Sequence, residues 1–216
     1  MKALIETRNT RPERVFLVGV ELKSRSHSDT RDSLAELGEL AGTAGGARAQ
    51  TLEEKATTCG ACHGENGVPQ EKITPIIWGQ KEGYLYLQLR DYKLGTRKND
   101  LMSPIAEALD RDGMFALAAY FAAKPWPDLR QPPAPPDIVK RALTASGSVG
   151  CTGCHLGEYQ GSGTVPRIAD QSRDYLAKTI ADFRSHIRGN NPGMSDLMQA
   201  TSEADLAALV DYLAGR

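Results

Sequence analysis

The sequence predicts an all-α protein built from two small helical domains in tandem, and three observations support this fold class. The pentapeptide pattern CxxCH occurs twice, at residues 59–63 and 151–155. The segments that follow the two pentapeptides match each other in order and spacing, so the chain contains an internal repeat. In both copies apolar residues recur at helical spacing, and neither copy has the alternating pattern of a convincing strand.

The internal repeat extends from the pentapeptides almost to the end of the chain. Five short motifs occur in the same order in both copies. The matching pairs are Gly79-Gln80 with Asp170-Gln171, Tyr84-Leu85 with Tyr175-Leu176, Arg97-Lys98-Asn99 with Arg188-Gly189-Asn190, Met102-Ser103 with Met194-Ser195, and 117–121 with 209–213. The spacing changes by one residue in the loop after the histidine and is restored before the methionines. We interpret the chain as a duplicated domain.

The domain limits follow from this repeat and from the prolines between its copies. A chain of 216 residues is long enough for two small domains, which we place at residues 51–124 and 138–216. Residues 125–137 are rich in proline, which cannot continue a helix and favours the extended polyproline II conformation. We therefore predict a semi-rigid linker there, and we assign residues 1–50 to an extension outside the repeat.

Three helices are expected in each copy. Thr51 is a suitable N-cap, with Glu54 at position N3 as in a capping box, for the helix that carries the first pentapeptide. Residues 82–93 have one apolar stripe, and residues 114–123 form a short Ala-rich helix that ends before Pro125. The corresponding helices of the second copy are expected at roughly 147–155, 174–187 and 203–213, the last of them capped by Ser202.

The two pentapeptides are the attachment signature of c-type haem. In this chemistry the two thiols of each CxxCH add to the haem vinyl groups as thioethers, and the following histidine becomes the proximal ligand of the iron. The pattern assigns Cys59, Cys62 and His63 to one haem, and Cys151, Cys154 and His155 to a second. We therefore predict two covalently bound haem c groups.

Other uses of the four cysteines fit the spacing less well. A structural zinc site would place its CxxC pairs about 15–20 residues apart, and a thioredoxin-type redox pair would lie beside a βαβ pattern. Two disulfides would not require a histidine directly after each cysteine pair. Haem attachment is the interpretation that accounts for all ten residues of the two pentapeptides.

The second axial ligand of each iron is predicted to be Met102 in the first copy and Met194 in the second. A thioether is a soft ligand that favours Fe(II), and the two methionines occupy equivalent positions in the repeat. The alternative for any methionine is packing in a core. Met198 is the nearest rival to Met194, but its counterpart is Ala106; Met114 corresponds to Leu206 and is expected in the core.

Aromatic and arginine side chains near each pentapeptide have two possible roles. Packing against the haem and the helices is expected for Trp78, Tyr84, Tyr92, Tyr175 and Phe183. The alternative is that Trp78 donates a hydrogen bond to a haem propionate, or that Arg97 and Arg188 form salt bridges with the propionates. The ordinary expectation for such arginines is that they are exposed and solvated.

Composition and missing motifs narrow the range of functions. A formal net charge of -1 does not support nucleic-acid binding, which needs a basic patch, and no apolar stretch approaches the length of a membrane-spanning helix. The chain has no nucleophile–base constellation and no phosphate-binding loop. Two six-coordinate irons would leave no open position for a substrate, which favours electron transfer over catalysis.

Residues 51–216 resemble the dihaem class I cytochromes c of the cytochrome c4 family. The resemblance rests on the two CxxCH motifs, on Gln80, Tyr84-Leu85, Gln88-Leu89, Tyr92-Lys93, Gly95 and Arg97, and on Met102-Ser103-Pro104-Ile105-Ala106 with Leu109 and 118–121. The second copy departs from this pattern at Asp196, where the first has Pro104.

The resemblance implies a periplasmic electron carrier with two class I cytochrome c domains. Its partners would be redox proteins, with a respiratory complex or dehydrogenase as donor and a terminal oxidase or reductase as acceptor. Two alternatives stay open: a haem subunit docked permanently to a dehydrogenase, and a dihaem oxidoreductase such as a thiosulfate dehydrogenase or peroxidase.

The first fifty residues do not fit this resemblance. Residues 13–22 are expected to form a strand and residues 32–40 an acidic helix, and residues 1–46 resemble an N-terminal fragment of an HflX-type ribosome-associated GTPase. Ala47-Arg48-Ala49 resembles a signal-peptide cleavage site, but no intact export signal precedes it. We expect a fusion or a mis-started reading frame; a native βα extension is the alternative.

Overall fold

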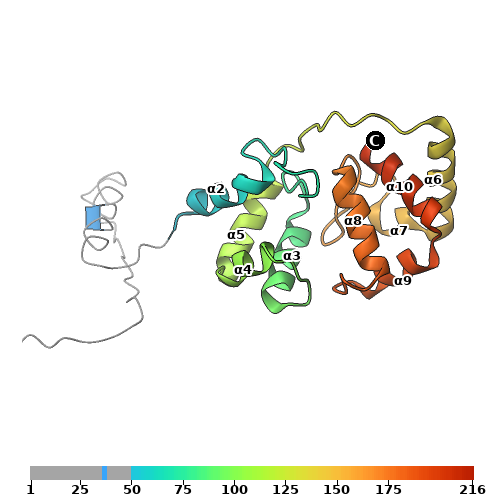
Figure 1. The fold of residues 1–216 in the computed structure, drawn as a ribbon. Helices are drawn as coiled ribbons and strands as arrows, with labels where there is room; N and C mark the ends of the chain where they lie inside the picture. Colours follow the sequence, from blue (N-terminus) through green and yellow to red (C-terminus); the bar gives the residue numbers. More distant parts are fainter. Residues whose placement is uncertain (1–35, 38–49) are drawn as a thin grey trace, which may run out of the picture. The chain divides into compact units, whose positions relative to one another are not determined.

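The computed structural model describes residues 36–37 and 50–216, and this part of the chain is helical (Figure 1). Both copies of the repeat lie within one compact unit, Leu52–Arg216. Over residues 50–216 the only β pairing is an isolated bridge between Ser162 and Val165, so the all-α prediction is confirmed there. The predicted βα extension and the resemblance to a GTPase fragment concern residues that lie, apart from Glu36 and Leu37, outside the described ones.

The first copy consists of four helices: α2 (Leu52–His63), α3 (Glu82–Leu94), α4 (Met102–Glu107) and α5 (Arg111–Ala122). Helix α3 packs against α4 and α5, and α2 packs against α5. Their shared core is made of Ala56, Leu85, Leu109, Met114, Leu117, Ala118 and Phe121. Met114 is therefore a core residue, as predicted.

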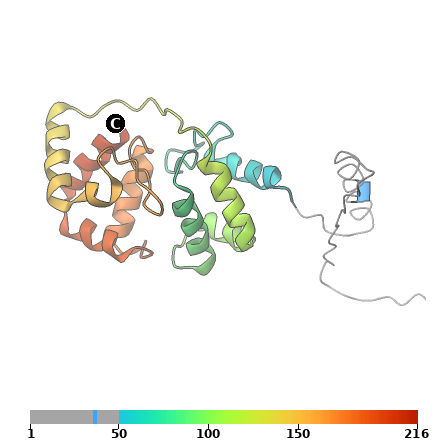
Figure 2. The same ribbon diagram turned by 180° about the vertical axis from the view of Figure 1, so that it is seen from behind.

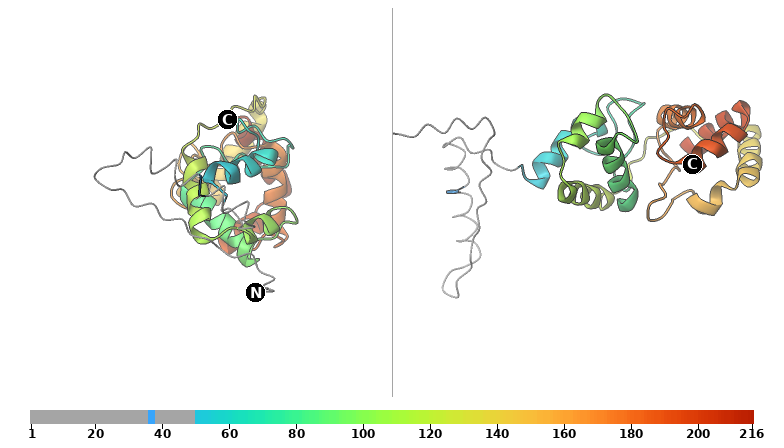
Figure 3. Two further views of the ribbon diagram at one scale, coloured as in Figure 1. Left: turned by 90° about the vertical axis from the view of Figure 1, so that its left-hand side faces the viewer. Right: turned by 90° about the horizontal axis from the view of Figure 1, so that it is seen from below.

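The second copy consists of five helices: α6 (Pro136–Val149), α7 (Cys151–His155), α8 (Arg173–Arg184), α9 (Pro192–Ala200) and α10 (Glu203–Ala214). Helix α10 packs against α6 and α8, and α8 also packs against α9 (Figure 3). The core between these helices includes Ala142, Phe183, Met198, Leu206 and Leu209. No helix in the described part of the chain is long and apolar enough to span a bilayer.

Several helix ends differ from the predicted ones for local reasons. Helix α5 begins earlier than residue 114, because the carboxylate of Asp110 accepts a hydrogen bond from the Gly113 amide (2.8 Å). The predicted helix 147–155 is in fact two helices, because Gly150 has the left-handed conformation (φ 79°) between α6 and α7. Helix α8 ends before residue 187, where His186 has a φ of 57°. Ser202 caps α10 as predicted, accepting from the Asp205 amide (3.2 Å).

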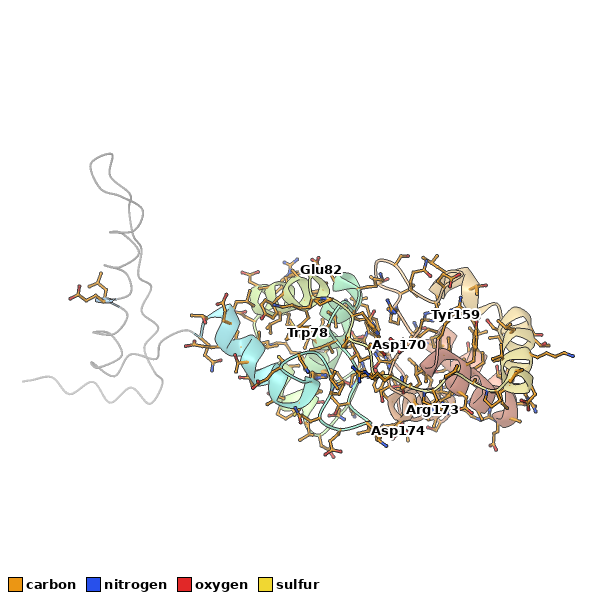
Figure 4. All side chains as sticks on the ribbon, turned by 90° about the horizontal axis from the view of Figure 1, so that it is seen from above. Trp78, Glu82, Tyr159, Asp170, Arg173 and Asp174 are labelled. Carbon is orange, nitrogen blue, oxygen red and sulfur yellow. The ribbon has the colours of Figure 1, made fainter. Side chains whose placement is uncertain are left out.

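The proline-rich segment between α5 and α6 is non-helical up to Pro135, and its contacts attach it to the second copy (Figure 2). The indole of Trp126 donates to the carbonyl of Asp170, which lies between the helices of the two copies in Figure 4. The Gln131 amide donates to the carbonyls of Gln171 (3.0 Å) and Ala214 (2.9 Å). Residues 136 and 137, assigned to the linker from the sequence, instead form the first turn of α6.

The two copies meet through hydrogen bonds that are reciprocal. The side chain of Gln80 accepts from the Arg167 amide (2.7 Å) and donates to the Arg167 carbonyl (2.9 Å). Its counterpart Gln171 accepts from the Ile76 amide (2.8 Å) and donates to the Ile76 carbonyl (3.1 Å). Since Ile76 and Arg167 are themselves equivalent in the repeat, the contact surface is approximately two-fold symmetric.

Candidate haem sites

The first pentapeptide forms the last turn of α2, which places the thiols of Cys59 and Cys62 one helical turn apart and His63 at the helix end. The second pentapeptide is the whole of α7 and repeats this arrangement. No two of the four cysteines form a disulfide, so the disulfide alternative is wrong. Residues 36–37 and 50–216 contain no cluster of three or more His, Cys, Asp or Glu that could hold a metal ion.

Each histidine is held by a carbonyl group through one ring nitrogen. The Nδ1 of His63 lies 2.8 Å from the carbonyl oxygen of Pro75, and the Nδ1 of His155 lies 2.9 Å from that of Pro166. A carbonyl only accepts, so Nδ1 carries the proton and donates, and Nε2 is left with a lone pair. This bond fixes the tautomer and the ring orientation, as a second-shell partner does for a metal-bound histidine.

Burial favours the neutral form of both imidazoles. His63 is 6% exposed and His155 is 7% exposed. Burial lowers the pKa of each histidine, and the hydrogen bond to the proline carbonyl opposes this shift only in part. The two rings are therefore neutral near pH 7, which is the form that ligates iron. Cysteines outside any disulfide and these neutral histidines together fit haem c.

Met102 and Met194 occupy matching places at helix starts. Met102 is the first residue of α4, and its amide donates to the side-chain oxygen of Asn99 (2.9 Å). Met194 lies in the first turn of α9, and its amide donates to the side-chain oxygen of Asn191 (3.1 Å). Both methionine side chains are half-buried. The methionines were predicted from their equivalent places in the repeat, whereas the role of the asparagines that hold their backbone was not predicted.

The asparagine bonds correct one detail of the repeat. The structural counterpart of Asn99 is Asn191, whereas the sequence pairing aligned Asn99 with Asn190. The extra residue of the second copy therefore lies just before Asn191. Asn190 has a different role, because its amide donates to Gln88 (3.1 Å) and to the carboxylate of Asp91 (2.8 Å), both in the first copy.

Arg97 and Arg188 are buried, so the expectation that they are exposed and solvated is wrong. Arg97 is 9% exposed and stacks on the Tyr92 ring at 4.6 Å; Arg188 is 6% exposed and stacks on Phe183 at 4.3 Å. The aromatic residues predicted to pack near the haems therefore also hold these guanidinium groups. Trp78 packs against the core of the first copy, as expected.

Comparison with known proteins identifies the family. No protein-family model matches the chain. Cytochrome c4 of Azotobacter vinelandii is 34% identical over 194 residues, which cover 82% of this chain and 91% of that protein. This chain belongs to the cytochrome c4 family. A structure of cytochrome c4 from Acidithiobacillus ferrooxidans matches with a TM-score of 0.67 at 28% identity, covering 74% of this chain and 99% of that one.

A second group of relatives is named for its redox partner. A thiosulfate dehydrogenase electron acceptor of Stutzerimonas stutzeri is 32% identical over 170 residues, which cover 74% of this chain and 79% of that protein. Family membership confirms three predictions: the tandem cytochrome fold, two covalently bound haem c groups and a function as a dihaem electron carrier. The chain therefore acts together with redox partners.

Proposed function

We propose that this protein is a periplasmic electron carrier whose two haems are each ligated by one histidine and one methionine. Cys59, Cys62, His63 and Met102 would hold the first haem, in the domain at residues 51–124. Cys151, Cys154, His155 and Met194 would hold the second, in the domain at residues 138–216. The observation that carries the proposal is the repeated setting of both ligands, with Nδ1 of each histidine on a proline carbonyl and each methionine amide on an asparagine side chain.

The protein's part in electron transfer is to hold both ligands still. Haem c, when bound, supplies one-electron exchange between Fe(II) and Fe(III). The bond to Pro75 keeps the Nε2 of His63 directed away from the loop that carries this proline, and burial keeps water from competing for that nitrogen. Asn99 holds the backbone amide of Met102, which fixes where the side chain that would supply the thioether begins. Ligands that do not rearrange keep the reorganisation small when an electron arrives or departs.

A dehydrogenase is the proposed electron donor, and a terminal oxidase or reductase the proposed acceptor. The relative named as an electron acceptor of thiosulfate dehydrogenase supports this class of donor. The two alternatives predict different behaviour. A permanent subunit would co-purify with its dehydrogenase in fixed ratio, whereas a carrier would be reduced by catalytic amounts of it. A dihaem oxidoreductase would need one iron with an open or exchangeable position.

The decisive experiment compares two methionine variants of the haem-loaded protein. Met194→Ala removes the proposed ligand, whereas Met198→Ala removes a core methionine four residues away that is 4% exposed. We expect the ferric protein to show a sulfur-to-iron charge-transfer band, which Met194→Ala halves and Met198→Ala leaves unchanged. Met194→Ala should also open one iron to carbon monoxide. Carbon monoxide binding by the unaltered protein, or by Met198→Ala instead, would contradict the proposed ligand set.

A further inference from the structure

Trp78 of the first copy and Tyr159 of the second are not counterparts in the repeat, yet they have matching surroundings. Both side chains are labelled in Figure 4. The repeat pairs Trp78 with Ala169. It pairs Tyr159 with Gly67, because each of these two residues lies four positions after the histidine of its pentapeptide. The aromatic and the small residue have therefore exchanged places between the two copies.

The apolar neighbours of the two aromatic side chains correspond. Tyr159 belongs to a core cluster with Leu176 and Leu213, against which Cys151 packs. The core cluster against which Trp78 packs contains the counterparts of both leucines, and the first cysteine of the first pentapeptide packs against it too; these residues are Leu85, Phe121 and Cys59. Each aromatic side chain therefore packs against the same core positions as the first cysteine of its pentapeptide.

A cation lies over each ring, and the two cations are counterparts in the repeat. The Nζ of Lys124 lies 5.6 Å from the ring centre of Trp78, and the guanidinium carbon of Arg216 lies 5.1 Å from that of Tyr159. Each cation also lies over the tyrosine four residues before it, at 4.2 and 5.4 Å. The same place in the domain is thus filled by an aromatic ring in both copies.

The backbone at the exchanged position has the same unusual conformation in both copies. Gly67 has a φ of 85°, and a Cβ added to it would lie 2.7 Å from the indole of Trp78, so the indole covers this glycine. Tyr159 has a φ of 52°, in the left-handed region that L side chains rarely adopt. Such a conformation costs free energy and persists only where the surrounding contacts offset it. The strain at Tyr159 is therefore a sign that its side chain has a task there.

The backbone of Tyr159 connects both ends of the loop that holds the histidine of the second haem site. This loop leads from His155 to Pro166, whose carbonyl oxygen lies 2.9 Å from the Nδ1 of the histidine. The amide of Tyr159 donates to the carbonyl of Leu156 at the start of the loop (3.0 Å). Its carbonyl accepts from the amide of Ile168, two residues after the proline (2.9 Å). A shift of Tyr159 would therefore move the carbonyl partner of the histidine.

The side chain of Tyr159 anchors this loop to two helices. Its phenol oxygen lies 2.7 Å from the hydroxyl of Ser146, which is buried in α6. Its ring packs edge-on against that of Tyr212 in α10, with the ring centres 5.9 Å apart. In the first copy, Trp78 reaches the corresponding loop from beyond its far end and covers Gly67. Each loop is therefore held against its core by one aromatic side chain.

We propose that Tyr159 is the positioning residue for the proximal histidine of the second haem, and that Trp78 has the same role for the first. The proposal rests on the haem sites proposed above. The aromatic ring holds the loop against the core, and the loop holds the proline carbonyl on the Nδ1 of the histidine. Partners of this kind orient a metal-bound histidine and raise its basicity.

The test follows the Nδ1 proton of each histidine by NMR after the reduced, haem-loaded protein is transferred into heavy water. Tyr159→Gly gives the second copy the small residue of the first without the indole that covers it there. The loop should open more often, so the proton of His155 should exchange about tenfold faster, as expected for the loss of one ordinary contact. The proton of His63 should keep its rate. One of the two reduction potentials should rise, because a weaker bond to Pro166 makes the histidine a poorer donor to Fe(III).

A double variant tests whether the two aromatic side chains are equivalent. Tyr159→Gly combined with Ala169→Trp builds the arrangement of the first copy into the second, and it should restore slow exchange at His155. Leu206→Ala is the matched control, because it removes a buried side chain (5% exposed) from a different core cluster of the same copy. This control should lower the unfolding midpoint and leave both histidine protons and both potentials unchanged.

Each outcome decides one claim. Unchanged exchange at His155 in Tyr159→Gly, or equally fast exchange in Leu206→Ala, would overturn the positioning role. Fast exchange that persists in the double variant would overturn the equivalence of the two aromatic side chains. If Tyr159→Gly does not retain haem, Tyr159→Phe and Ser146→Ala each remove the bond to α6 and should speed the exchange by a smaller factor. No change in either of these variants would also overturn the proposal. Failure of the underlying haem proposal would show separately, as an unaltered protein without two haems per chain.

Discussion

Replacing Gln171 by methionine removes a side chain that makes three hydrogen bonds at the contact between the two copies. Gln171 bonds both the amide and the carbonyl of Ile76, and its oxygen also accepts from the Ser172 amide (2.9 Å). Each such bond contributes about 1 kcal/mol, and a buried peptide group left without a partner costs about 1–3 kcal/mol. Ile76 is 1% exposed, so water cannot replace the lost bonds. Gln171→Met should therefore lower the free energy of unfolding by about 3–5 kcal/mol.

The assay is guanidinium unfolding of the haem-loaded protein, followed by haem absorbance and by far-UV circular dichroism. For a protein of this size the slope is about 4 kcal/mol per molar guanidinium, so the midpoint should fall by about 1 M. Gln80→Met, the two-fold equivalent, should lose a similar amount. Gln70→Met, at an exposed position whose side chain has no described hydrogen bond, is the control. If Gln171→Met and Gln70→Met unfold at the same denaturant concentration, the reasoning about this contact is wrong.

Three further predictions concern the sites and helix ends. Thiol titration of the denatured, haem-loaded protein should find no free thiol, because all four cysteines are expected in thioether bonds; two or more reactive thiols would contradict two haems. Asn99→Ala should weaken the charge-transfer band of one haem, because it releases the backbone of Met102. Asp110→Ala removes a helix cap remote from the methionine and should only lower stability, by about 1 kcal/mol. If the two variants have equal spectra, Asn99 does not position the methionine. Ser202→Ala should cost about 1 kcal/mol at pH 7 in thermal unfolding. The Ser202 hydroxyl and then Arg141 lower the pKa of Asp205. The ionised carboxylate therefore stabilises the fold above its ordinary pKa, and this stabilisation should fade as the pH drops below that value.

The features that sequence could predict are those carried by local patterns. The two pentapeptides identify the cofactor because thioether attachment needs two thiols and a histidine at one fixed spacing. Ser202 was predicted as a cap because its hydroxyl acts on an amide only three residues away. Helix 82–93 was predicted within one residue of its observed end, since its apolar stripe is a local signal.

The features that sequence missed depend on distant partners. Arg97 looked exposed because its phenol partner, Tyr175, lies 78 positions away in the chain. The start of α6 was not predicted correctly, because its first residue, Pro136, belongs to the same proline-rich run as the extended segment before it. Proline suits the first helical position as well as it suits an extended segment, so composition alone does not separate the two.

The reciprocal bonds between the copies have a consequence for the two haems. Gln80 binds Arg167 just as its counterpart Gln171 binds Ile76. Tyr84 likewise accepts from Arg188 just as Tyr175 accepts from Arg97, so the contact surface is complementary to itself, as two-fold interfaces are. Because the two copies belong to one chain, each copy's side of this contact can acquire different residues while the two sides still bind each other. The inequality is visible here, since Gln88 of the first copy corresponds to Thr179 of the second, and Asn190 is an insertion that binds Asp91. The polar groups around Arg97 and Arg188 therefore differ between the two copies, while the settings of the proposed haem ligands stay the same. We expect two unequal reduction potentials on this ground, and the difference should shrink in a Gln88→Thr variant.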